Sequence, residues 1–96
     1  MYRIERTAGF DSWLDGLRDE RAQEKIAGRI LRVESGLLGD WKTVGSGVSE
    51  IRIDYGPGYR LYYTMRGQVL VILLCGSDKR DQDRAIKLAK ELAKTV

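Results

Sequence analysis

The chain has 96 residues, enough for one domain with a modest core. Its apolar fraction of 43% and charged fraction of 32% indicate a globular protein, and the apolar run Val69–Cys75 is far too short to cross a bilayer. The net charge of +3 permits an anionic partner without requiring one. With no histidine and one cysteine, the chain lacks the usual ligands of a zinc site and cannot form an internal disulfide. We therefore expect one domain over residues 1–96, with no metal and with Cys75 as a buried apolar side chain.

The N-terminal residues Tyr2–Arg6 alternate polar and apolar, which predicts a short strand. They contain no continuous apolar stretch like that of a signal peptide, so we expect a cytoplasmic protein with no membrane contact. Thr7 is a suitable cap for a first helix. That helix carries an apolar stripe at helical spacing, formed by Phe10, Trp13, Leu14 and Leu17.

A second, longer helix is predicted from a cap at Asp19 to about Ser35, with Gly36 as its terminator. Its expected buried stripe consists of Ile26, Ile30, Val33 and Leu37. Two consecutive helices with a short joint are typical of a helical hairpin.

The central stretch Val48–Gly76 contains three strand-like runs joined by glycine-containing turns, and a short strand over Lys42–Val44 precedes it. In the first two runs the side chains alternate between faces. One face is expected to carry these polar and aromatic residues: Glu50, Arg52, Asp54, Arg60, Tyr62, Thr64 and Arg66. The opposite face is expected to enter the core. The third run is apolar on both faces, which suits a strand covered on both sides.

Ser77 or Asp78 is expected to cap a final helix. The predicted element order is β-α-α-β-β-β-β-α. This order fits the α+β class, as an antiparallel sheet with helices on one face.

Three strings of this sequence resemble the addiction module killer protein family, which is similar to the RelE-like and HigB-like toxins of bacterial type II toxin–antitoxin systems. The strings are Gly39–Lys42, Gly47–Tyr63 and Leu73–Asp83. The resemblance covers essentially the whole chain. It implies a RelE-like fold and an endoribonuclease, or mRNA interferase, that cleaves mRNA on the translating ribosome. It also implies a small helix-turn-helix antitoxin as partner in a toxin–antitoxin hetero-oligomer, and neither a metal nor an organic cofactor.

Metal-free RNA cleavage uses the ribose 2′-OH as nucleophile and needs a base, positive charge on the phosphorane and an acid for the leaving oxygen. The resemblance implies Arg60, in the family's Gly-Tyr-Arg motif, as the arginine that contacts the phosphate. Arg52 stands where RelE-like toxins carry a lysine, and Lys79 and Arg80 match the basic pair after their last strand. One of that pair could bind phosphate or assist the leaving group.

Two further RNA contacts are expected from the residue types. Tyr62 shares a face with Arg60 and could stack a base or donate to phosphate. Lys42 could make another phosphate contact. The catalytic candidates are thus Arg60, Arg52, Lys79 and Glu50, and the RNA-binding candidates are Arg80, Tyr62 and Lys42.

This sequence departs from the family in two ways. It has Glu50 where RelE-like toxins commonly carry a lysine, and it has no histidine, which several HigB-like toxins use. Glu50 is a candidate base, but pairing with Arg52 or Arg60 is the favoured interpretation. The arginines could simply form cross-strand pairs, and Lys79 and Arg80 could belong to a charge cluster at the helix start. These departures keep a second function open, a catalytically weak binding partner of the antitoxin that acts in operon regulation.

Overall fold

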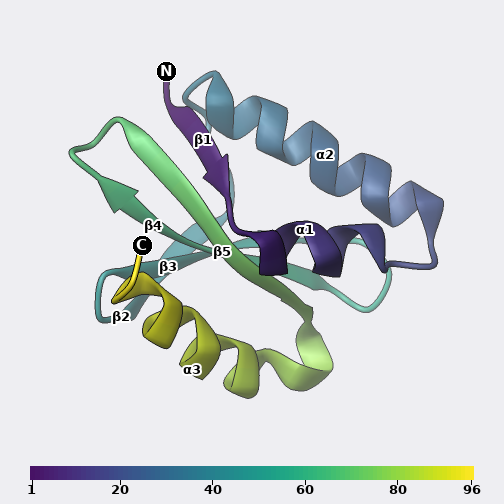
Figure 1. Ribbon diagram of the computed structural model, residues 1–96. Helices are drawn as coiled ribbons and strands as arrows, with labels where there is room; N and C mark the ends of the chain where they lie inside the picture. Colours follow the sequence, from purple (N-terminus) through teal and green to yellow (C-terminus); the bar gives the residue numbers. More distant parts are fainter.

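A computed structural model describes residues 1–96 and contains the predicted order of elements (Figure 1). The strands are β1 (Arg3–Arg6), β2 (Trp41–Gly45), β3 (Val48–Ile53), β4 (Tyr59–Arg66) and β5 (Leu70–Asp78). The helices are α1 (Ala8–Asp15), α2 (Glu20–Glu34) and α3 (Gln82–Ala93), with a 3-10 turn over Lys79–Asp81 before α3. No helix is long and apolar enough to span a membrane.

The five strands form one open sheet in the order β1-β5-β4-β3-β2. The meander of β2 to β5 is antiparallel, as predicted. The sheet as a whole is mixed, because β1 pairs in parallel with β5, with Arg3 opposite Leu70 and Arg6 opposite Leu73. The prediction of a wholly antiparallel sheet was therefore wrong at β1. Parallel strands need a long crossover connection, and α1 and α2 are part of the chain that separates β1 from β5.

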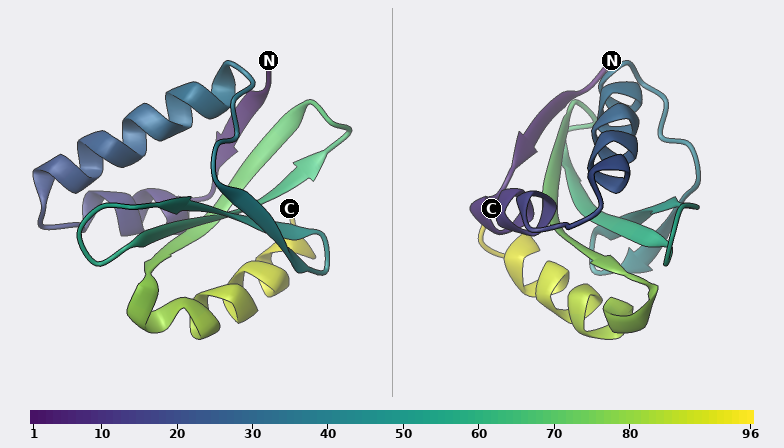
Figure 2. Two further views of the ribbon diagram at one scale, coloured as in Figure 1. Left: turned by 180° about the vertical axis from the view of Figure 1, so that it is seen from behind. Right: turned by 90° about the vertical axis from the view of Figure 1, so that its right-hand side faces the viewer.

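The helices cover both faces of the sheet, not one face as predicted (Figures 1 and 2). On one face, Phe10 of α1 and Ile26 of α2 pack on Ile51, Leu61 and other residues of the sheet. On the other face, Ala85 and Ala89 of α3 pack on a separate cluster of sheet residues that includes Leu74. The apolar character of β5 on both faces follows from these two layers.

The predicted helix ends are confirmed by their hydrogen bonds. Thr7 accepts from the Phe10 amide at 3.0 Å, and Asp19 accepts from the Arg21 amide at 3.0 Å. Gly36 follows α2 with a φ of 102°, the left-handed conformation that glycine adopts without strain. At the other end of the chain, Asp78 caps the 3-10 turn that leads into α3.

One predicted core residue lies elsewhere. Leu37 was expected in the buried stripe of α2, but the helix ends at Glu34 and the Leu37 side chain is exposed. Ile26 and Val33 of the same stripe are buried as expected. Leu37 no longer follows the helical spacing once the chain turns at Gly36, so periodicity alone placed it wrongly.

Candidate active site

An open pocket of about 270 Å³ lies where the ends of β3 and β5 meet the start of β4. Its lining brings together three of the predicted catalytic residues, Arg52, Arg60 and Lys79. The full lining is Asp40, Arg52, Ile53, Asp54, Gly58, Tyr59, Arg60 and Lys79. We call this the catalytic pocket, after the predicted catalytic residues in its lining.

The register of the strands explains why these cations meet. Arg52 of β3 lies directly opposite Arg60 of β4, and Arg60 lies opposite Ser77 of β5. Residues opposite one another in an antiparallel pair project from the same face. Lys79 follows β5 by one residue, so the chain delivers it to the same end of the sheet.

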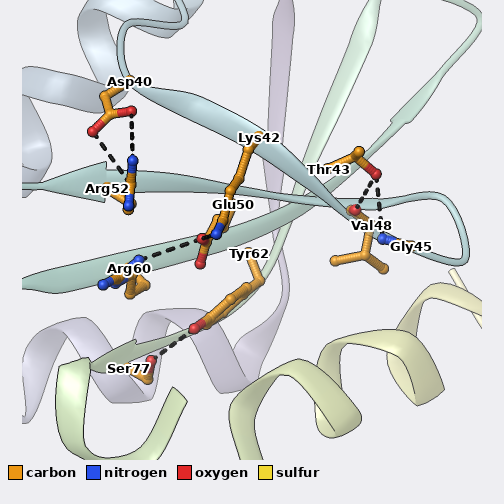
Figure 3. Close-up of polar contacts among 10 residues, drawn as sticks. All are labelled: Asp40, Lys42, Thr43, Gly45, Val48, Glu50, Arg52, Arg60, Tyr62 and Ser77. Atoms are coloured by element: carbon orange, nitrogen blue, oxygen red, sulfur yellow. Dashed lines mark hydrogen bonds and ion pairs between the residues drawn. The ribbon is translucent and has the colours of Figure 1, made fainter. Parts of the chain in front are cut away.

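Glu50 is almost fully buried, with 2% of its surface exposed, and it holds Arg60 (Figure 3). Nη1 of Arg60 lies 3.3 Å from Oε1 of Glu50, and Nζ of Lys42 lies 3.5 Å from the same oxygen. The Arg60 side chain is 13% exposed, so solvent screens this pair little. Of the two partners predicted for Glu50, the structure selects Arg60.

Arg52 pairs instead with Asp40 on the loop before β2 (Figure 3). Its Nε lies 3.3 Å from Oδ2 of Asp40, and both side chains are largely exposed. The Arg52 amide also donates to the Asp40 carbonyl oxygen at 2.9 Å. An exposed pair of this kind contributes little stability, so the guanidinium can exchange the carboxylate for a phosphate at small cost. Asp40 was not among the predicted site residues, although it belongs to the Gly39–Lys42 string that carried part of the resemblance.

Tyr62 lies on the predicted face of β4 but is completely buried beneath α3. Its hydroxyl shares a hydrogen bond of 3.1 Å with the Ser77 hydroxyl. Burial raises the pKa of Tyr62 above its ordinary value, because the ionised form would be poorly solvated. The prediction that this ring stacks an RNA base was wrong, because no face of the ring reaches solvent.

The two basic residues after β5 have different surroundings. Lys79 lines the catalytic pocket and takes part in none of the ion pairs of the chain. Arg80 lies outside that lining, is 83% exposed at its side chain and pairs with Asp78 at 2.7 Å. Hydrogen bonding to Arg80 lowers the pKa of Asp78. The alternative of a helix-start charge cluster therefore describes Arg80, while Lys79 is free to bind an anion.

The chemistry available in the catalytic pocket is that of a cation cluster. Arg52, Arg60 and Lys79 can together bind a phosphate, and arginine can do so with two parallel hydrogen bonds. The two carboxylates in the lining are Asp40, which is paired, and Asp54, which is exposed. No group of three or more histidine, cysteine or carboxylate side chains is placed to hold a metal ion.

No protein-family model matches the chain. An uncharacterized protein of Haemophilus influenzae is 52% identical over 94 residues, which cover 98% of this chain and 95% of that protein. The chain belongs to the family of this Haemophilus protein. At that identity and coverage, the two members of the family share the whole domain.

Two solved structures identify the fold of the family. A mutant of the Escherichia coli RelE toxin in the free state matches with a TM-score of 0.70 and 17% identity, over 99% of this chain and 97% of that chain. The intact E. coli RelBE toxin–antitoxin complex contains a chain that matches with a TM-score of 0.67 and 14% identity, over 83% of this chain and 99% of that chain. The predicted RelE-like fold is thereby confirmed.

Proposed function

We propose that this protein is the toxin of a toxin–antitoxin module and an endoribonuclease that cleaves mRNA on the translating ribosome without a metal. The observation that carries the proposal is the catalytic pocket itself, in which Arg52, Arg60 and Lys79 converge on a RelE fold. An open pocket with these cations suits a phosphodiester, whose charge increases as the pentavalent phosphorane forms.

In the proposed mechanism the ribose 2′-oxygen attacks the adjacent phosphorus while its proton passes to solvent water in the open pocket. The bond from phosphorus to the 5′-oxygen of the next nucleotide breaks, which leaves a 2′,3′-cyclic phosphate on one fragment and a 5′-hydroxyl on the other. Arg60 stabilises the charge on the phosphorane, and its ion pair with Glu50 fixes the orientation of the guanidinium before substrate binds. Lys79 protonates or neutralises the leaving oxygen, and Arg52 releases Asp40 to bind a phosphate oxygen. Electrostatic stabilisation of the transition state, and not a strong base, then supplies most of the rate enhancement.

The proposed partners are mRNA, the ribosome and a small helix-turn-helix antitoxin, with which the protein forms a hetero-oligomer in the cytoplasm. Support for an antitoxin comes from the second solved structure, which is a toxin–antitoxin complex of the same fold. The finer resemblance to HigB-like and addiction module killer proteins stays a prediction, as does the phosphate contact of Lys42.

The test is induction of the chain in a bacterial host, with growth measured and mRNA 5′ ends mapped. Wild type is expected to cleave within translated codons. Lys79→Ala is expected to lower cleavage by about 100-fold, the size of a typical acid or charge contribution in a transition state. Lys79 is exposed and has no ion pair, so its loss should leave the fold intact. Lys87→Ala removes an equal charge from an exposed position on α3 outside the pocket and is the matched control.

Arg60→Ala is expected to abolish cleavage and growth arrest. Because Glu50 would then be buried with Lys42 as its remaining cation, Arg60→Lys is needed beside it. The lysine keeps a charge for Glu50 but loses the two-pronged phosphate contact. Full toxicity of well-folded Arg60→Ala would remove Arg60 from the mechanism, and full toxicity of Arg60→Lys would show that its charge suffices without the two-pronged contact.

A second function, that of a binding partner without strong catalysis, is favoured by one observation. Glu50 occupies a position where the resemblance implies a lysine, and its carboxylate is held by two cations inside the protein. A soluble, folded chain that causes no cleavage and no growth arrest, yet binds its antitoxin, would establish this function in place of the nuclease.

A further inference from the structure

A second open groove, of about 350 Å³, lies between α2 and the end of β3. We call it the α2 groove. Its lining residues are Lys25, Gly28, Arg29, Arg32, Ile53 and Asp54. Lys25, Arg29 and Arg32 follow one another at spacings of four and three residues, so they project from one face of the helix. The groove thus has three cations against one carboxylate.

These cations have no acidic partners. None of the ion pairs of the chain includes Lys25, Arg29 or Arg32. Lys25 lies over the Tyr55 ring, with Nζ 5.3 Å from the centroid. Burial, followed by repulsion from Arg32, lowers the pKa of Arg29. Like charges held together without an ion-pair partner favour the binding of an anion, because it reduces their repulsion.

Arg29, one of the lining residues of this groove, is held by two hydrogen bonds to backbone carbonyl oxygens. Nη1 donates to the Arg52 carbonyl oxygen at 3.2 Å, and Nη2 donates to the Leu38 carbonyl oxygen at 3.3 Å. The Nε–H of Arg29 is buried and has no hydrogen-bond partner. The guanidinium therefore presents a positive charge whose orientation is set by the protein backbone.

Gly28 keeps the groove open. It lies in the middle of α2, where glycine costs about 0.5–1 kcal/mol relative to alanine. A Cβ added at Gly28 would have no atom within 4 Å, so packing does not require glycine at this position. Absence of a side chain there leaves room for a ligand between Lys25 and Arg32.

The α2 groove and the catalytic pocket adjoin, because Ile53 and Asp54 line both. Arg29 reaches from the groove to the backbone of Arg52, whose side chain lines the pocket. We propose that the α2 groove binds a phosphate of the mRNA strand whose reacting phosphate occupies the catalytic pocket. The proposal rests on the proposed function and adds to it a path for the RNA backbone, from the pocket past the end of β3 and onto α2.

The test uses a short single-stranded RNA with 2′-O-methyl riboses, which binds but cannot be cleaved because its 2′-oxygen is blocked. Its affinity is measured against salt concentration for wild type and for Gly28→Glu. A Cβ added at Gly28 meets no atom within 4 Å, so the substitution adds a carboxylate without removing a cation of the groove. We expect affinity to fall about tenfold and the slope of log K against log salt to decrease by about 0.7, the value for one phosphate contact in a single strand. Gly28→Gln has the same size without the charge and is expected to bind much more like wild type.

Arg32→Ala, which removes a groove cation, is the second variant, and its control is Lys87→Ala, an exposed lysine on α3 across the sheet. Vacant ribosomes form a second arm of the binding measurement. Loss of oligonucleotide affinity in Gly28→Glu and Arg32→Ala, but not in the two control variants, supports the mRNA path. Loss confined to the ribosome arm would overturn that path and give the groove to ribosomal RNA.

Two other results would overturn the proposal. In the first, wild type binds neither the oligonucleotide nor the ribosome, or the two groove variants bind the oligonucleotide with the same affinity and the same salt dependence as wild type. In the second, a poly-glutamate peptide competes as well as the RNA, which would indicate an acidic protein as the ligand. Failure of the proposed function is seen separately, as absence of mRNA cleavage by wild type in cells. Lys79→Ala, which leaves the α2 groove intact, should still bind the oligonucleotide.

Discussion

The two faces of the sheet are both covered by helices but are held in different ways. Beneath α1 and α2 the contact is made by apolar and aromatic side chains, with the Trp13 ring 5.7 Å from Phe10 and 6.3 Å from Tyr59 between centroids. Beneath α3 an apolar cluster is continued, toward the catalytic pocket, by the buried polar residues Glu50 and Ser77. The first face supplies packing, and the second fixes the orientation of charged groups at the edge of the core.

The largest effect should come from breaking the buried ion pair on the α3 face. Glu50→Ala is expected to lower the free energy of unfolding by about 3 kcal/mol, because Arg60 would keep its charge at a nearly buried position without its carboxylate. Urea unfolding of the purified protein measures this value. Adding Arg60→Met should restore much of the loss, since replacing both charges with apolar groups removes the unpaired ion.

The exposed pair in the same pocket provides the control. Asp40→Ala breaks the contact with Arg52, but both side chains are largely in solvent, and we expect a loss of about 0.5 kcal/mol or less. Equal losses for Glu50→Ala and Asp40→Ala would contradict the distinction between a buried polar layer and an exposed rim.

On the α1 face the sharpest change is Gly76→Ala. The Cβ added at Gly76 would overlap the Trp13 ring, so either the ring or the strand must move. We expect a loss of about 2 kcal/mol in the free energy of unfolding, the cost of overpacking a core. Elsewhere in a strand the same change would stabilise, because glycine loses more backbone entropy on folding.

Trp13→Leu separates the cost of overlap with the Trp13 ring from the backbone effect of replacing glycine. With the large ring gone, Gly76→Ala should cost much less than it does in wild type. A cost that is the same in both backgrounds would show that the close approach of Trp13 is not what excludes a side chain at this position.

Much of the fold could be predicted because its local signals agree. The caps at Thr7 and Asp19, the helical stripes and the alternation of β3 and β4 all act over a few residues. The pairing of β1 with β5 joins residues 67 positions apart, such as Arg3 and Leu70, and nothing in either strand specifies that partner. The apolar residues on both faces of β5 indicated that both faces are covered. Which face α3 covers depends on long-range packing of the whole chain, and no local pattern predicts it.

The same distinction holds at the candidate site. Alternation correctly placed Arg52 and Arg60 on one face, and strand order then brought Lys79 to them. Alternation assigns a face without saying what covers it, which is why Tyr62 was expected to meet RNA and lies instead under α3. The α2 groove was missed because its cations are spaced like any solvated helix face, and only their lack of acidic partners distinguishes them.

The last expected effect appears only at high pH and concerns Cys75, which lies in the apolar part of the α3 face and donates a hydrogen bond to the Ala85 carbonyl oxygen at 3.5 Å. Burial raises the pKa of its thiol from 9.0 to about 11. The unfolded chain therefore loses this proton at lower pH than the folded chain, and the thiol's contribution to stability is complete below pH 9 and falls as pH rises toward 11. Denaturant unfolding of wild type and Cys75→Ala measures it, because the other titrating groups contribute equally to both. Over that interval the stability of wild type should fall relative to that of Cys75→Ala. A stability difference that does not change with pH would mean that the thiol is solvated in the folded state. The α3 face would then be less tightly closed than the face beneath α1 and α2.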